Sequence, residues 1–195
     1  MGFTYFHLGE RDVREAMVLM WSAEWAEIEG LPEGRRPYGK DLTSAGWAAF
    51  ATAMPEALDA HDDDWLAERM DRPSYFRSAR PRQTRSGGTT MVRVNLREAI
   101  KQLCYGEFNI AYIRGLAHAL QSRGETHAVV YRAGSAVEAR AECSSWEGQE
   151  FPLDQIIGGH RARYWPERDD GAWSVPAGVN CHHSIRAVTA AAQAA

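Results

Sequence analysis

Cysteine is scarce in this sequence, which contains three among its 195 residues: Cys104, Cys143 and Cys181. Three thiols in a chain of this length cannot form the disulfide framework that stabilises small secreted domains. In a reducing compartment each thiol is expected to be buried, to bind a metal or to be reactive. Cys104 lies among apolar residues in a stretch with helical periodicity, which favours packing in the core.

Long apolar stretches and a secretory signal pattern are also missing. No apolar run reaches the about 20 residues that a membrane-spanning helix needs. The first residues, MGFTYFHLGERD, lack the basic start and the apolar middle of a signal peptide. The formal net charge of -4 argues against nonspecific nucleic-acid binding by the whole surface, although a local basic patch is compatible with it. We therefore expect no membrane contact and a location in the cytoplasm of the cell that makes the protein.

Catalytic signatures are the third absence. The sequence has no Gly-rich phosphate loop, no GxSxG nucleophile elbow and no helix that pairs two carboxylates. A cysteine next to a histidine, as in Cys181 and His182, does not usually reach the geometry of a nucleophilic dyad. The sequence therefore predicts a protein without enzymatic activity.

The composition that is present, 45% apolar and 25% charged, is that of an ordinary globular protein. Residues 10–30 have helical periodicity, with an apolar stripe that leaves Glu24 outside it. A second helix is expected to begin at Thr43 or Ser44. We expect an interruption at Pro55, because proline fits a helix only near its first turn.

Two further helices have clear start signals. HDDDWLAERM, residues 61–70, places three acids before an apolar run, which suits a helix N-terminus. A divalent-ion site is the alternative there, but consecutive side chains point in different directions. The longest helix is expected to begin after Asn95, a capping residue with Glu98 three positions later, and to stop at Gly124.

Residues 77–90, RSARPRQTRSGGTT, form the clearest break in composition. They contain four arginines, one proline and a Gly-Gly pair, but no acidic residue. This composition predicts a flexible loop or arm. The segment is either a solvated linker or a contact surface for phosphate groups or a partner, since guanidinium groups bind phosphate through two hydrogen bonds. The candidate contact residues are Arg77, Arg80, Arg82 and Arg85.

The pattern changes after Gly124. THAVVYRA, residues 126–133, predicts a strand, and the chain that follows is rich in turns and aromatic residues. We therefore predict an α+β fold, with a helical N-terminal region followed by a small loop-rich α+β C-terminal module. The expected parts are residues 1–90 for the helical region with its arm at 77–90, residues 91–188 for the long helix and the module, and residues 189–195 for a flexible tail.

The C-terminal module contains the donor types of a structural zinc site in Cys143, His160, Cys181 and His183. In an extended stretch, Cys181 and His183 face one side while His182 faces the other. The spacing does not match a zinc finger. The alternative is that the cysteines are buried thiols and that the histidines hydrogen-bond the backbone. Structural zinc is the one cofactor that the sequence suggests.

Two segments of this module together resemble a known family. RAECSSWEGQEFPLD, residues 140–154, is followed after a spacer by NCHHSI, residues 180–185. This order is similar to that of the Mu-F-type head-morphogenesis proteins and the related minor capsid proteins of tailed phages. The residues that match the family are Cys143, Gly148, Phe151 and Asp154 in the first segment and Asn180, Cys181, His183 and Ser184 in the second. The resemblance does not extend to residues 1–90.

The sequence also departs from that family. Many members have another cysteine shortly before the position of Cys143, and this chain has none there. Gly178 stands where many members have a histidine, and His183 stands in place of a second cysteine. Two potential metal ligands are therefore lost, which favours a structural role for the motif over a catalytic one.

The resemblance implies a structural virion component, a minor capsid or head-morphogenesis protein that acts at the portal or in the capsid interior. It implies portal and major capsid subunits as partners, phage DNA as a further contact, and a location in the virion after assembly in the host cytoplasm.

Two alternatives stay open. One is a nuclease-like or toxin-like enzyme, for which His160, Arg161, Arg163 and His182 are the only candidate set. The other is a DNA-binding head-tail adaptor that uses the arginine arm.

Overall fold

A computed structural model describes residues 2–32, 36–37, 39, 41–134, 144–163, 165–167, 169, 171–177 and 181–188. Its helices are α1 (Arg11–Ile28), α2 (Ser44–Ala60), α3 (Asp63–Met70), the short 3-10 helix η2 (Pro73–Tyr75), α4 (Leu96–Ser122) and α6 (Leu153–Gly158). Its strands are β1 (Ala79–Gln83), β2 (Thr89–Arg93), β3 (His127–Arg132), β4 (Glu150–Pro152) and β5 (His183–Ala187).

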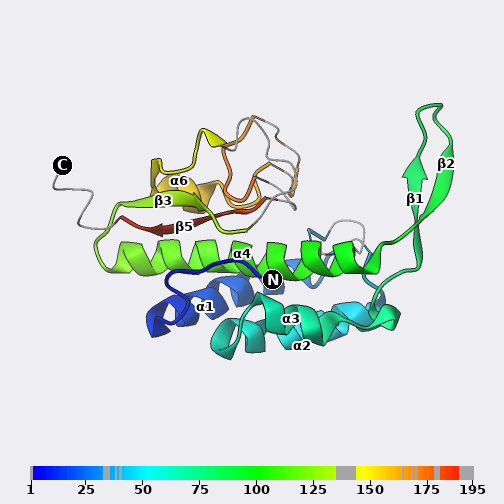
Figure 1. Ribbon diagram of the computed structural model, residues 1–195, viewed down its shortest axis with the longest axis horizontal. Coiled ribbons are helices and arrows are strands. Elements are labelled where there is room, and N and C mark those ends of the chain that lie inside the picture. Colours follow the sequence, from blue (N-terminus) through cyan, green and yellow to red (C-terminus); the bar gives the residue numbers. More distant parts are fainter. Residues whose placement is uncertain are drawn as a thin grey trace.

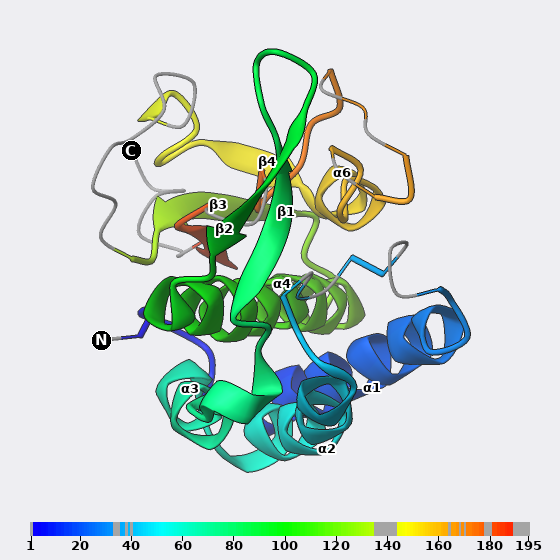
Figure 2. The same ribbon diagram turned by 90° about the vertical axis from the view of Figure 1, so that its right-hand side faces the viewer.

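Helix α4 lies in the middle of the molecule, between two layers (Figure 1). Helices α1, α2 and α3 pack on one side of it, and the sheet of β3, β4 and β5 with helix α6 lies on the other (Figure 2). Strands β1 and β2 form an arm that projects from the end of the molecule where α4 begins. The predicted α+β fold, with helices first and a small sheet after them, is confirmed. None of the helices within the described ranges is long and apolar enough to cross a membrane.

The predicted helix starts are confirmed by their capping bonds. The hydroxyl of Thr43 accepts a hydrogen bond from the Gly46 N–H, and the Asp62 carboxylate accepts one from the Trp65 N–H. The Asn95 side chain accepts one from the Glu98 N–H at the start of α4. These bonds satisfy N–H groups that have no partner inside the helix.

The predicted interruption at Pro55 is wrong. Helix α2 runs without a break from Ser44 to Ala60, with Pro55 inside it. Proline removes one hydrogen bond of the helix, but Phe50, Met54 and Leu58 are fully buried on the same helix. We infer that this packing outweighs the lost bond.

The core is continuous across both sides of α4. One cluster of buried apolar side chains contains Met17 of α1, Leu116 of α4 and Ile185 of β5. Helices α1 and α4 approach each other closely at Gly115, where a Cβ atom would lie 2.7 Å from the backbone nitrogen of Met17. This approach is possible because glycine has no side chain.

The C-terminal sheet has the strand order β4-β3-β5, and both pairings are antiparallel. Ala128 of the central strand β3 is paired with Phe151 on one side and with Ala187 on the other. The two segments that carry the family resemblance therefore flank the same strand.

The segment 77–90, expected to be a flexible loop or arm, belongs to a β-hairpin. Strands β1 and β2 pair antiparallel, with Arg82 opposite Thr90. The Thr84 N–H donates to the Gly88 carbonyl at 2.7 Å, and Gly87 has a φ of 83°. The Gly-Gly pair thus forms the turn, because glycine adopts a positive φ at little cost.

Candidate functional site

His183 connects the two segments that carry the resemblance. It begins strand β5 and is 1% exposed. Its Nε2 atom lies 2.8 Å from Oε1 of Glu147, which precedes β4. Its backbone carbonyl accepts a hydrogen bond from Asn109 Nδ2 of α4 at 2.8 Å. His183 therefore joins both segments to each other and to the central helix.

Glu147 accepts the hydrogen bond that links the two segments. It also forms an ion pair with Arg132, at the end of β3. The hydrogen bond from His183, together with Arg132, holds the pKa of the Glu147 carboxyl below its ordinary value. A charged Glu147 thus links β3 and β5 through their side chains, in addition to the bonds between their backbones.

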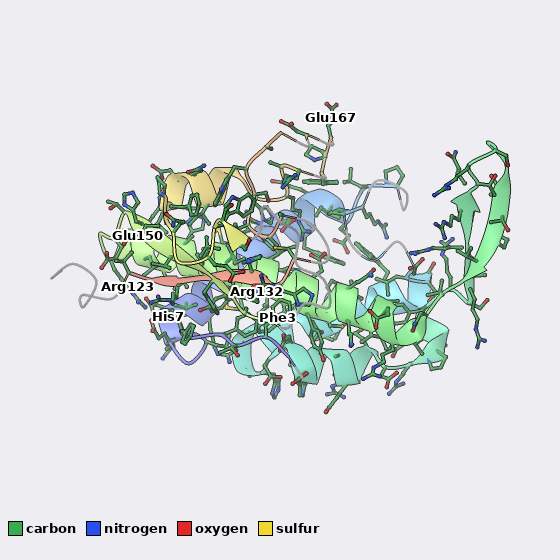
Figure 3. The ribbon with its side chains drawn as sticks, turned by 45° about the horizontal axis from the view of Figure 1, so that its top comes forward. Phe3, His7, Arg123, Arg132, Glu150 and Glu167 are labelled. Atoms are coloured by element: carbon green, nitrogen blue, oxygen red, sulfur yellow. The ribbon has the colours of Figure 1, made fainter. Side chains whose placement is uncertain are left out.

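The side chains around Cys181 alternate as the sequence predicts. Cys181 and His183 are both buried, and Cys181 Sγ lies 3.5 Å from His183 Nδ1. The ring of His182 packs instead against the ring of Phe3, with centroids 5.4 Å apart. Phe3 lies beside the end of the sheet, close to Arg132 (Figure 3), because the Thr4 N–H donates to the Ala133 carbonyl at 2.9 Å.

The separation of Cys181 and His183 suits a hydrogen bond between sulfur and nitrogen, and it also suits two positions of a zinc site. Ligands at about 2.3 Å (sulfur) and 2.0 Å (nitrogen) from a tetrahedral zinc are separated by about 3.5 Å, and these two atoms lie at 3.5 Å. Cys143, the expected third ligand, lies outside the described residues. In the described part of the chain no three His, Cys, Asp or Glu side chains are placed to share an ion, so His160 does not join Cys181 and His183.

His160 belongs to a different group, a buried ionic cluster that we define as Glu24, Glu107, Arg114, His160 and Arg161. Arg161 is 1% exposed, and its Nε and Nη2 atoms each lie 2.5 Å from a carboxylate, that of Glu24 of α1 and that of Glu107 of α4. Arg114 of α4 lies 3.0 Å and His160 3.1 Å from the second oxygen of Glu24. The cluster thus ties the loop after α6 to both helices.

The two carboxylates of the ionic cluster have opposite pKa shifts. Burial alone would raise the pKa of Glu24, but Arg161, His160 and Arg114 surround it and lower the pKa to about 2. Burial dominates at Glu107, whose cationic neighbour in the described chain is Arg161, and raises its pKa to about 7. Burial also lowers the pKa of His160 to about 4, despite the nearby Glu24. Near neutral pH, His160 is therefore uncharged, and Glu107 is the carboxyl group that gains a proton first.

Sequence reasoning missed the two acids of this cluster. Glu24 was expected outside the apolar stripe of α1, but it is 6% exposed. Its spacing from Trp21 and Ile28, three and four residues, is that of the buried face, and this signal was available in the sequence. Glu107 is 4% exposed on α4, a helix that is covered from both sides. No local sequence pattern indicates that Glu107 is buried.

The arginines of residues 77–90 occupy two different environments. At the base of the arm, Arg80 Nη1 lies 2.7 Å from the buried carboxylate of Asp41. Arg77 is also bound at the base, where its backbone N–H donates to the Asp41 carbonyl at 2.8 Å. Arg82 and Arg85 lie further out and are exposed. A hollow of about 350 Å³ lies where the arm meets α4, along residues 93–96.

Comparison of the chain with protein-family models, with curated proteins and with solved structures gave no match.

Proposed function

We propose that this chain is a structural component of a tailed-phage virion, a minor capsid or head-morphogenesis protein that acts at the portal or in the capsid interior. The observation that carries the proposal is the contact between His183 and Glu147 at 2.8 Å. It joins the two sequence segments that resemble the family, although they are far apart in the chain. The proposal does not require a bound zinc ion.

The residues that match the family have structural tasks here, which supports a structural role. Gly148 has a φ of 79°, a conformation that favours glycine, in the turn before β4. Phe151 packs against the core, and Ser184 is fully buried. Asp154, in the first turn of α6, accepts a hydrogen bond from Gln121 of α4 at 2.6 Å. Each of these contacts holds the module together or attaches it to α4.

The placement of His160 and Arg161 also favours a structural role over the nuclease-like alternative. An enzyme would need these side chains on a concave surface that a substrate can reach. The Arg161 side chain is instead 1% exposed and bound to two carboxylates, and that of His160 is 15% exposed beside Glu24. A nuclease assay on the purified protein, with His160→Ala and His182→Ala as variants, tests this argument. Hydrolysis that both variants abolish would overturn it.

The contact surface for portal or capsid subunits is expected on the outer side of the helical layer. Trp21 and Trp25 are 5% and 9% exposed, so they belong to the core and are not available to a partner. Leu19 of α1 is 63% exposed. The central part of a protein interface is more apolar than its rim, so Leu19 is the candidate contact that we test.

The test is to produce the chain together with the portal and major capsid subunits of the same phage and to separate assembled heads by sedimentation. We expect the chain to sediment with the heads, at few copies per head. Leu19→Asp should reduce its incorporation several-fold, while Thr52→Asp, at an exposed position of α2, should not. If heads form and the wild-type chain stays with the unassembled protein, the proposal is wrong.

A further inference from the structure

The hairpin of β1 and β2 differs from the rest of the molecule in its charge. Between Arg77 and Arg93 the sequence has five arginines and no Asp or Glu, although the whole chain has a net charge of -4. Arg93 on β2 adds to the four arginines of residues 77–90. The excess of positive charge is therefore concentrated on one projecting element.

The hairpin is also poorly packed. No residue from 77 to 98 is buried, and Met91 is 63% exposed. An isolated two-stranded hairpin is only marginally stable in water, but this one is fixed at its base. The Leu42–Phe76 bridge and the ion pair between Arg80 and Asp41 attach it to the helical layer. The outer part is thus held away from the body, where a partner can reach it from several sides (Figures 1 and 2).

Three arginines of the arm are available to such a partner. Arg82, Arg85 and Arg93 are exposed, and none of the described residues forms an ion pair or a hydrogen bond with their side chains. The pairing of the strands places them in different directions. Arg82 shares one face of the hairpin with its cross-strand partner Thr90, Arg93 shares the other face with Ala79, and Arg85 lies in the turn. The arm is therefore cationic on both faces and at its tip.

We propose that this arm binds duplex DNA by entering a groove, with its arginines on the phosphate groups of both walls. A groove has a phosphate backbone on each side, which matches cations on both faces, whereas a flat acidic protein surface would meet only one face. The major groove of B-DNA, about 12 Å wide, admits a two-stranded ribbon. The five residues of each strand span about 17 Å at about 3.4 Å per residue, which is sufficient to cross it.

The composition of the arm favours duplex DNA over two other partners. Residues 77–95 contain no Phe, Tyr or Trp. Proteins that bind single strands stack bases on aromatic side chains, and the hot spots of protein interfaces contain Trp and Tyr besides Arg. RNA duplexes have a deep, narrow major groove that such a ribbon cannot enter. The inference rests on the charge and the geometry of the arm and does not depend on the role in head assembly.

The experiment measures binding of the full chain to a fluorescent 20-base-pair duplex of mixed sequence at 50 and 200 mM salt. The test variant is Arg82→Gln/Arg85→Gln. The control is Arg11→Gln/Arg123→Gln, which also removes two positive charges, from exposed ion pairs with Glu15 and with Glu10 and Asp12. Arg123 follows the C-terminal end of α4, which lies about 40 Å from the start of this helix, since 27 residues rise about 1.5 Å each. Circular dichroism establishes that both variants fold.

We expect the wild type and the control to bind the duplex and to weaken steeply with salt. Two phosphate contacts contribute about 1.8 to the slope of log affinity against log salt. Between 50 and 200 mM salt, the wild type should therefore lose about 12-fold more affinity than the test variant. The inference would be overturned if the wild type does not bind the duplex, or if the test and control variants lose the same affinity. Tighter binding to single-stranded DNA or to a polyglutamate peptide than to the duplex would also overturn it. None of these results bears on the head-assembly role, which is measured by incorporation into heads.

Discussion

Replacing Arg161 with methionine is the most direct test of how the C-terminal module is attached. Arg161 is the residue that joins Glu24 and Glu107, and all three are buried. In Arg161→Met, Glu24 keeps Arg114 as a cationic partner. Glu107 keeps no cation among the described residues. Removing one partner of a buried ion pair costs about 3–5 kcal/mol, because the other charge stays buried without compensation. This is a large part of the about 5–15 kcal/mol by which proteins of ordinary stability are folded.

The measurement is urea unfolding, followed by circular dichroism at pH 8 and at pH 5. In the wild type, with Arg161 beside it, Glu107 has a pKa of about 7 and is charged at pH 8 but protonated at pH 5. Without Arg161 its pKa rises further, so at pH 8 the variant must either bury the charge or take up a proton. The loss caused by Arg161→Met should therefore be larger at pH 8. The double variant Arg161→Met/Glu107→Gln removes both charges and should be more stable than Arg161→Met alone at pH 8. A loss below about 1 kcal/mol, or a double variant less stable than the single one, would refute the role given to this cluster.

Three further predictions concern single residues. Gly115→Ala should lower the free energy of unfolding by about 1–3 kcal/mol, because its Cβ would meet the backbone of Met17, while Gly9→Ala, in open space, serves as the control in the same urea titration. The folded-state pKa of His160 is about 4, below its ordinary 6.5, so the unfolded chain takes up the proton first. The stability that His160 contributes is therefore complete above pH 6.5 and is lost as the pH falls toward 4. His160→Asn should remove this part of the pH dependence, and an unchanged difference between pH 7 and pH 4.5 would contradict the assignment. If Cys181 holds structural zinc, elemental analysis should find about one ion per chain, as a single site requires. Cys181→Ser should remove this ion. A protein whose melting temperature is the same when it contains no zinc would contradict the metal site.

The parts of the fold that the sequence predicts correctly are set by local interactions. Asn95 and Glu98 are three residues apart, and Asp62 caps the helix that starts directly after it. The strand at 126–133 and the alternation of Cys181 and His183 follow in the same way from neighbouring side chains. In such cases the sequence contains both partners within one turn or one strand, so the pattern is sufficient.

The parts that could not be predicted depend on partners far apart in the chain. Arg161 and Glu24 are separated by 137 residues, and Arg161 and Glu107 by 54. A charged residue in a loop is predicted to be solvated unless its distant partner is known. For Arg161 that prediction is wrong, because the residue is buried. The same holds for Pro55, since the packing that preserves α2 comes from other helices. The composition of residues 77–90 does not distinguish a linker from a hairpin, because glycine and arginine are common in both linkers and tight turns.

The central position of α4 limits how this protein can be divided. Because the helical layer and the sheet rest on opposite sides of one helix and share one core, a fragment that ends near Gly124 would expose apolar surface to water along much of that helix. Neither half is expected to remain monomeric when produced alone. In the full chain, heat should unfold the helical layer and the sheet in a single transition. The hairpin is the exception. Its residues contribute nothing to the shared core, so it can be shortened or exchanged while the remainder keeps its shape.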